Sequence, residues 1–516
     1  MTYIINDTNL IVEITGEIAT KVNEYKKHCE NNDLDFSHPL DDDIVGSDGF
    51  IKKLILDKSG EIDYSQAQEL DSLWAELIKK SIECLRLFDR REPFETLQSS
   101  GTTKTPEAYG LDTLTKYHNR YTTFESMLYG ASSFYRDHVF HAFRTWMLGV
   151  FCLVKALECD PNNPIIVLDG GGQTEFSKTI NFFEKISMWT IMALCHDLGY
   201  PLEKAEQILD KTREMMKAFV PRPNIWSNFG FNGTQDNINE YIIKFISTKM
   251  KPEIDKQNND KKSQKEVEYL GRIQPKYYLK FAKSLENFEH GIVSSVIVYK
   301  MLLYFLESDF NLNDDYHYTQ EDARQFYIRR EILRAMASHT CADVYNIFFT
   351  TFSSLLFLCD EMQQWGRKSW NDMYAGLNSN DIKLEINEFS PSKVDIEEIV
   401  DMKGVNSTAL LANNMQRIFE QQYSRYKIKF RDGQYTKVSD LSIKKKMILE
   451  LPTEGATKNE IEINYMLSRD KSEFIADFCQ APSYDKQKVV DEIKEAIKNS
   501  LYKSDFISKL SSNEAI

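Results

Sequence analysis

The chain has 516 residues, of which 42% are hydrophobic and 27% charged, which is the balance of an ordinary globular protein with a sizeable core. This length leaves room for two or three domains. The formal net charge of −15 disfavours non-specific binding to nucleic acid or to an anionic membrane, so an anionic nucleotide would need a local basic pocket or metal ions.

Cysteine usage and the first residues predict a cytoplasmic protein. The 8 cysteines are scattered without a CxxC pair and lie mostly in apolar runs, which is typical of buried thiols in a reducing compartment. The stretch from Met1 to Asp7 lacks the basic and apolar regions of a signal peptide. The apolar run from Trp146 to Leu157 contains Lys155 and is shorter than the ~20 residues that span a membrane, so we expect a core helix there.

In chain order, residues 1–118 are expected to form an irregular, mostly helical N-terminal region with a helix from Leu70 to Phe88. Residues 119–378 are strongly helical and form the expected catalytic domain. Apolar residues at helical spacing predict helices at 134–157, 179–198, 287–306, 325–345 and 350–365. Gly199 and Pro201 are expected to end the second of these helices, and the lysine-rich segment 250–266 is expected to be a surface loop.

The sequence pattern changes after residue 378. Segments 382–386 and 426–430 alternate apolar and polar residues, the period of a half-buried strand, and 444–451 is a third candidate strand. A helix is expected between the first two, at 407–425. The fold class predicted for the whole chain is mainly α, with a helical core and a smaller C-terminal α+β region at 379–516.

The strongest chemical signal is the doublet His196-Asp197, which stands at the end of an apolar helical run. Burying an unpaired carboxylate is costly, so a buried aspartate usually has a cation or a hydrogen-bond donor beside it. Two side chains that can bind metal, placed in succession where a helix ends, are therefore a poor way to build a core.

Four further residues join the doublet, each on its own apolar helical segment: His141, His290, His339 and Asp360. A single histidine on an apolar helix is more often a hydrogen-bonded core residue than a ligand. His339 lies on the apolar stripe of its helix with Ile332 and Met336, which predicts that it is buried. The ordered set of six, rather than any one member, predicts a metal site.

The residue types indicate which cations fit. Imidazole and carboxylate ligands suit iron, manganese, cobalt or zinc, and the lack of cysteine ligands argues against a structural zinc. Two histidines with two aspartates can hold one cation, and two additional histidines can hold a second, with Asp197 as the bridge. Paired cations stabilise both the attacking and the leaving oxygen of a phosphoryl displacement.

Over residues 130–370 this set resembles the HD-domain superfamily of metal-dependent phosphohydrolases. The string from Leu194 to Gly199 is close to the hallmark of that family, and Asp360 matches its late aspartate. The first histidine of the family matches best at His141, and His138 is the second choice. The resemblance implies an HD-type helical core with one or two divalent ions, which can be Mn, Fe, Mg or Co.

Other positions bear on the subgroup. His290 and Ser294 resemble the His-x-x-x-Ser that follows the doublet in deoxynucleotide triphosphohydrolases, and His339 resembles the additional histidine of dinuclear HD enzymes. The chain departs from the family three residues after the aspartate, where Tyr200 replaces the common Lys or His. The second downstream histidine usual in triphosphohydrolases is also missing near the doublet.

These departures shape the catalytic candidates. Lys204, one turn after Tyr200, or Tyr200 itself is expected to donate a proton or to contact phosphate, and His290 is a candidate to assist the leaving group. Guanidinium and ammonium groups near the set are candidate phosphate contacts, although a solvated surface position is more common for any one of them. The expected substrate-binding residues are Arg136, His138, Arg144, Lys283 and Arg334.

The leading functional hypothesis is a deoxynucleoside triphosphate triphosphohydrolase that uses metal-activated water. An HD phosphodiesterase acting on cyclic nucleotides or alarmones is the alternative within the same class. An HD-fold di-iron oxygenase and a non-catalytic nucleotide-sensing module are alternatives of other classes. We also expect a nucleotide effector and a homo-oligomer, with no membrane partner and no stable binding to nucleic acid.

Overall fold

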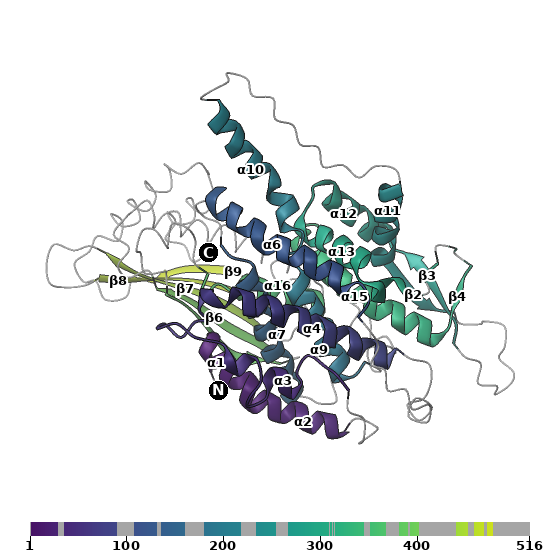
Figure 1. The fold of residues 1–516 in the computed structure, drawn as a ribbon. Helices are drawn as coiled ribbons and strands as arrows, with labels where there is room; N and C mark the ends of the chain where they lie inside the picture. Colours follow the sequence, from purple (N-terminus) through teal and green to yellow (C-terminus); the bar gives the residue numbers. More distant parts are fainter. Residues whose placement is uncertain are drawn as a thin grey trace.

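The computed structural model is mainly α-helical, with two sheets at opposite ends of a helical core (Figure 1). The predicted mainly-α class is confirmed. The structure describes residues 2–28, 36–89, 108–131, 136–159, 180–217, 234–253, 267–308, 310–311, 313, 315–344, 351–367, 381–390, 393–401, 440–451, 459–468 and 472–477.

The N-terminal part is helical. Its elements are α1 (Asp7–Glu13), a π-helical turn (Ile14–Ile18), α2 (Ala19–His28), α3 (Asp42–Val45), α4 (Ala67–Phe88) and α6 (Leu111–Ala131). The helix predicted from Leu70 to Phe88 is confirmed as α4. Helix α6 runs through the boundary predicted after residue 118, so the secondary structure has no break at that point.

The central helices carry the histidines and aspartates singled out above. They are α7 (Val139–Cys159), α9 (Phe182–Cys195), α13 (His290–Met301), α15 (Gln320–Thr340) and α16 (Phe352–Met362). Helix α9 starts with a capping box, in which the Asn181 side chain accepts from the Glu184 backbone N–H and the Glu184 carboxylate accepts from that of Asn181. Every residue from Phe183 to Cys195 is buried, because α9 packs against α4, α7, α15 and α16.

The structure places some helix ends differently from the sequence prediction. Helix α7 begins at Val139 rather than at 134, because the Asp137 carboxylate accepts from the backbone N–H of His141 at 3.2 Å and caps the first turn. The helix predicted at 287–306 is two helices, α13 and α14 (Leu303–Leu306), separated by Leu302 in an extended conformation.

Helix α9 ends before Gly199, as predicted, but Pro201 has a different role from the one expected. The chain makes one turn over residues 196–199 and α10 (Tyr200–Met216) follows at once. Pro201 lies in the first turn of α10, where its missing N–H has no acceptor to lose. The doublet therefore lies in a tight turn between two helices.

A small antiparallel sheet, which the sequence did not predict, lies beside helices α11 (Thr234–Ser247) and α12 (Pro275–Glu286) (Figure 1). Its strands are β2 (Thr248–Pro252), β3 (Tyr269–Ile273) and β4 (His317–Tyr318). The loop expected at 250–266 thus begins inside β2, and residues 254–266 lie outside the described residues.

The larger sheet has the strand order β1-β5-β6-β7-β8-β9. Its strands are β1 (Tyr3–Ile5), β5 (Asp381–Phe389), β6 (Lys393–Asp401), β7 (Asp440–Leu451), β8 (Asn459–Ser468) and β9 (Ser472–Asp477). Strands β6 and β7 are parallel, and the other neighbours are antiparallel. The strands predicted at 382–386 and 444–451 are confirmed, whereas the strand at 426–430 and the helix at 407–425 lie outside the described residues.

One hydrophobic core joins these parts. The alternation predicted for β5 is present, since Leu384 and Ile386 are buried and Lys383 is exposed. The same buried cluster includes Ile14 of the N-terminal region and Trp189 of α9. Among the described helices, none combines the length and the hydropathy that a membrane span requires. Within the same ranges, Cys84, Cys152, Cys195, Cys341 and Cys359 are buried free thiols.

Candidate metal centre

Close packing against α13 holds the doublet turn in place. The Ser294 hydroxyl donates to the carbonyl of His196 at 2.6 Å and accepts from the backbone N–H of Gly199 at 2.8 Å. A side chain at position 199 would collide with the backbone carbonyl of His290, so glycine is required for this approach. Ser294 thus fixes the backbone on both sides of Asp197.

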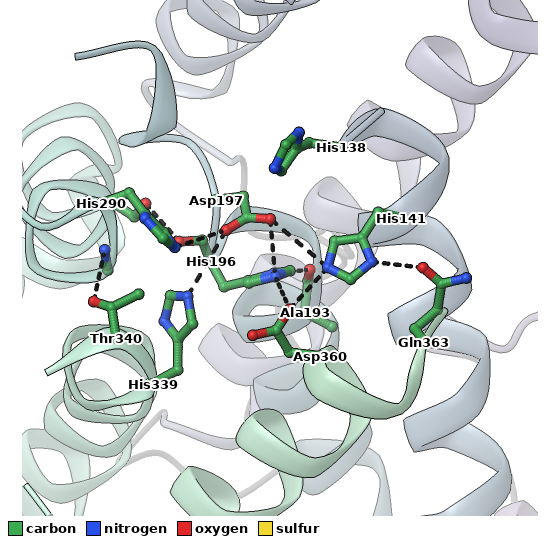
Figure 2. A network of polar contacts seen from close by, with 12 residues as sticks. His138, His141, Ala193, His196, Asp197, His290, His339, Thr340, Asp360 and Gln363 are labelled. Atoms are coloured by element: carbon green, nitrogen blue, oxygen red, sulfur yellow. Dashed lines mark hydrogen bonds and ion pairs between the residues drawn. The ribbon is translucent and has the colours of Figure 1, made fainter. Parts of the chain in front are cut away.

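Helices α7 and α16 bring two more ligand candidates to the doublet. His141 Nε2 lies 2.8 Å from Asp360 Oδ1 and 3.8 Å from Asp197 Oδ2. His196 Nε2 lies 3.2 Å from Asp197 Oδ2 and 3.6 Å from Asp360 Oδ1. Figure 2 shows the two rings and the two carboxylates pointing toward one another. The predicted set of two histidines and two aspartates is therefore assembled.

A second group forms on the other oxygen of Asp197. His290 Nε2 lies 3.3 Å from Asp197 Oδ1, and His339 Nε2 lies 3.8 Å from the same atom (Figure 2). The close approach of α13 to α15 depends on Gly291, where a Cβ would lie 2.5 Å from the carbonyl oxygen of Met336. Asp197 therefore stands between two groups of nitrogen atoms, with one oxygen facing each.

Each of the four rings is anchored through its Nδ1 atom. The acceptors are Gln363 Oε1 for His141, the Ala193 carbonyl for His196, Glu203 Oε2 for His290 and the Met336 carbonyl for His339, at distances of 2.6 to 2.8 Å. The Gln363 amide is oriented by its own donation to the Trp365 carbonyl at 2.7 Å. Because oxygen atoms accept at Nδ1, the neutral tautomer that would bind a metal ion carries its proton there and has its Nε2 lone pair on the inner side.

The inward-facing atoms fit a cation. In each of three groups, namely His141 with His196 and Asp197, His196 with His339 and Asp360, and Asp197 with His290 and His339, the ligand atoms lie within 4.8 Å of one another. Within the described part of the chain, His196 Nε2 and His339 Nε2 are buried without a hydrogen-bond partner. Leaving such an atom unsatisfied costs about 1–3 kcal/mol, a cost that coordination to a metal ion would remove. The residues present can therefore hold a metal ion.

The ionised carboxylates of the cluster favour the binding of a cation. Burial opposes ionisation of Asp197 and Asp360, but the surrounding imidazoles hold the pKa of both carboxyl groups well below its usual range. Burial alone would lower the pKa of His196, but the two carboxylates raise it to about 10. Burial lowers the pKa of His339 to about 4, so that ring is neutral near pH 7. Carboxylates with neutral imidazoles are the forms that bind metal, so His339 already has that form, and a cation would displace the proton that the two carboxylates hold on His196.

The predicted catalytic candidates lie at the edge of this cluster. The ring centroids of Tyr200 and His138 are 4.1 Å apart, and those of Tyr200 and His290 are 5.3 Å apart. Lys204 Nζ lies 2.5 Å from Glu203 Oε1 and 5.0 Å from the centroid of the Tyr200 ring. The side chains of Tyr200, Lys204 and His138 therefore lie beside the cluster of six ligand candidates.

The first two predicted phosphate contacts, Arg136 and Arg144, have different environments. Arg136 donates to Gln364 Oε1 at 2.6 Å, and Gln364 follows shortly after Asp360 in the chain. Arg144 is fully buried and forms an ion pair with Asp7 at 2.7 Å, so the prediction of a phosphate contact at Arg144 is wrong. Arg144 is one helical turn after His141, but its guanidinium is held inside the core by the Asp7 carboxylate.

The last two predicted phosphate contacts have partners on α12 and at the end of α15. Lys283 is exposed and pairs with Asp343 at 3.0 Å. The guanidinium of Arg334 stacks over the ring of Tyr277 at 3.9 Å and contacts the Gln274 side chain.

Three residues of the site were not predicted as site residues. Glu203 and Gln363 anchor ligand rings, and Arg367 donates to the backbone carbonyl of Asp137 at 3.1 Å. Each is near a ligand in sequence, one turn or two after the doublet or after Asp360. That spacing is the only signal the sequence offered, because their partners are distant along the chain.

Comparison with known proteins provides no relative from which a role could be transferred. No protein-family model, no curated protein and no solved structure matches the chain.

Proposed function

We propose that the protein is a metal-dependent phosphohydrolase of the HD type that cleaves a phosphoester or phosphoanhydride bond of a nucleotide. The observation that supports this most is the position of Asp197, whose two oxygens face separate groups of histidine Nε2 atoms. A carboxylate shared between two cation positions is the arrangement suited to phosphoryl displacement, where both the attacking and the leaving oxygen need stabilisation.

The six ligand candidates divide between the two positions. His141, His196, Asp360 and one oxygen of Asp197 would hold one divalent cation, and His290, His339 and the other oxygen of Asp197 would hold a second. Divalent ions such as Mn, Fe, Mg or Co would supply a water of lowered pKa and offset the charge of the phosphate. The anchored Nδ1 atoms keep all four rings oriented for this task.

Proton donation to the leaving group is assigned to Tyr200, with Lys204 as the other candidate. Burial and the charge of Glu203 raise the pKa of Tyr200, so its hydroxyl keeps its proton near pH 7 and would give it up only to a strongly basic leaving oxygen. His290 is a poorer donor than the sequence suggested, because Glu203 occupies its Nδ1 and its Nε2 faces Asp197. We therefore place His290 among the metal ligands.

Two substrate classes follow from different observations. The spacing of His290 and Ser294 favours deoxynucleoside triphosphates, but the two hydrogen bonds of the Ser294 hydroxyl give that serine a structural role. The second candidate, a phosphodiesterase acting on cyclic nucleotides or alarmones, is favoured because both His290 and His339 face Asp197 Oδ1.

Metal analysis together with a substrate panel tests the proposal. Purified protein would be analysed for bound metal by mass spectrometry and incubated with Mn²⁺ and a set of deoxynucleoside triphosphates and cyclic dinucleotides. Tripolyphosphate plus nucleoside identifies the first class, and a linear product identifies the second. Asp197→Ala should abolish both metal binding and turnover, whereas Asp210→Asn, which removes a 60% exposed carboxylate from α10, should change neither.

Other outcomes would contradict the proposal. Bound iron with an O₂-dependent optical change and no phosphate release would indicate the oxygenase. Unchanged metal content in Asp197→Ala, together with an inactive wild type, would indicate a non-catalytic module.

A further inference from the structure

The segment after α16 lies along the segment before α7. Gln363 accepts from His141 Nδ1 at 2.6 Å, and one residue later Gln364 accepts from Arg136 at 2.6 Å. Arg367 then donates to the backbone carbonyl of Asp137 at 3.1 Å. These contacts hold two guanidinium groups, those of Arg136 and Arg367, beside the segment that leads into the helix of the ligand candidate His141.

Arg367 is electrostatically unusual. In the part of the chain that the structure describes, its guanidinium forms no ion pair with a carboxylate, and its buried Nε has no hydrogen-bond partner. The contrast is Arg144, whose Nε and Nη2 both donate to the carboxylate of Asp7. A half-buried arginine with an unused Nε–H has donor capacity for an anionic ligand.

Arg367 lies close to the metal centre, because Asp137, whose carbonyl accepts from the Arg367 guanidinium, also accepts through its carboxylate from the backbone N–H of His141. Burial lowers the pKa of the neighbouring His138 to about 3, and the guanidinium of Arg367 adds to this lowering. The same positive charge acts on the Tyr200 hydroxyl, together with that of Arg136. The guanidinium therefore lies on the side of the cluster that carries His138, His141 and Tyr200.

We propose that Arg367, assisted by Arg136, forms an anion-binding subsite beside the metal centre that takes a phosphate group of the substrate. The inference rests on the proposed function, because it names the residues that hold the phosphate which the centre would attack. Arginine suits this task because its planar fork can make two parallel hydrogen bonds to phosphate oxygens. The chain's net charge of −15 disfavours the approach of a nucleotide, and a local cationic group beside the metal ions would help to offset that field.

The test compares Arg367→Gln and Arg367→Lys with Arg120→Gln, which removes an exposed arginine from α6. For each metal-loaded protein, the metal content, the affinity for inorganic phosphate by calorimetry, and KM and kcat for the best nucleotide would be measured. Arg367→Gln should keep its metal and weaken phosphate binding roughly ten- to hundredfold, the range for losing hydrogen bonds to a charged group. Arg367→Lys should recover part of the loss, and Arg120→Gln should match the wild type.

Two results would overturn the inference while leaving the proposed function intact. Unchanged phosphate affinity and KM in Arg367→Gln, in an enzyme that hydrolyses nucleotides, would remove Arg367 from the binding site. Loss of metal in both Arg367 variants would make it a support for His141 rather than a phosphate ligand. A wild type that binds no metal and hydrolyses no nucleotide would instead refute the proposed function.

Discussion

Glu203 accepts two hydrogen bonds from His290, one from Nδ1 at 2.6 Å and one from the backbone N–H at 3.0 Å. The carboxylate therefore fixes the first turn of α13 and the orientation of the ring together. The pKa of Glu203 is held below its usual range, because His290 and Lys204 outweigh the effect of burial. The ionised group strengthens the imidazole as a ligand.

Glu203→Gln keeps an oxygen that can accept from Nδ1 but removes the charge. We expect the affinity for the ion on the His290 side to fall by about 10- to 100-fold, the usual effect of losing a partner behind a ligand. Titration of the metal-free protein with Mn²⁺ would measure this. Glu214→Gln, which removes a 61% exposed carboxylate from the same helix, is the control and should bind as the wild type does.

The two aspartates should differ in how much metal their loss removes. Asp197 faces both groups of histidines, whereas the ion-pair distances of Asp360 join it to His141 and His196. Asp197→Asn should therefore lose the ions of both positions, and Asp360→Asn should keep the one beside His290 and His339. Metal per chain after dialysis, measured by mass spectrometry, distinguishes them. Equal metal content in the two variants would contradict the division into two positions.

The buried ion pair between Arg144 and Asp7 should govern stability rather than substrate binding. Both side chains are 0% exposed, and Asp7 also accepts from the Trp365 indole at 2.9 Å. Arg144→Met leaves the Asp7 charge uncompensated, which should lower the free energy of unfolding by about 3–5 kcal/mol. Urea unfolding measures the loss.

The double variant Asp7→Asn with Arg144→Met is the control, because it removes the uncompensated charge. It should recover part of the loss. A raised KM for nucleotide in Arg144→Met, with stability unchanged, would restore the phosphate role that the sequence suggested.

Lys185 should make the protein more stable in mildly alkaline solution. Burial in α9 lowers its pKa to about 8 from the value of 10.5 in the unfolded chain. Between these values the unfolded state binds more protons, so stability rises with pH across that window and is reduced below it. Lys185→Met should stabilise the protein at pH 7 by about 3 kcal/mol, at 1.36 kcal/mol per pKa unit.

Urea unfolding at pH 7 and at pH 10 measures the effect of this substitution. The difference between variant and wild type should shrink at the higher pH. A difference that is the same at both values would show that the Lys185 charge is not the cause.

The ligand candidates could be predicted from the sequence because each is a polar, ionisable residue in or next to an apolar helical run. A histidine in the apolar run around His141, or an aspartate after Cys359, has no local partner in its own helix. What the sequence could not show is how Asp197 is oriented, since that depends on Ser294 and Gly199 closing the turn against α13.

The sequence does not predict a residue's role correctly where that role depends on contacts with distant parts of the chain. Arg144 lies one helical turn from His141, but its partner Asp7 is 137 residues earlier in the chain, and no local pattern connects them. The sequence does not single out Glu203 and Gln363 for the same reason, because a residue that anchors a ligand ring is identified only by its contact with that ring. The alternating pattern indicated β5, and the segment 444–451 was a further candidate that became β7, but a three-residue strand such as β1 is too short to show a period.

The pairing of β1 with β5 gives the first residues of the chain a mechanical role. Tyr3 to Ile5 cover the edge of β5, and two residues later Asp7 is locked to Arg144 in the helix that carries His141. Residues 3–7 therefore link the larger sheet to helix α7, which carries the ligand candidate His141. Trimming these residues would expose a strand edge able to recruit other chains into aggregates, and would loosen the helix that carries the ligand candidate His141.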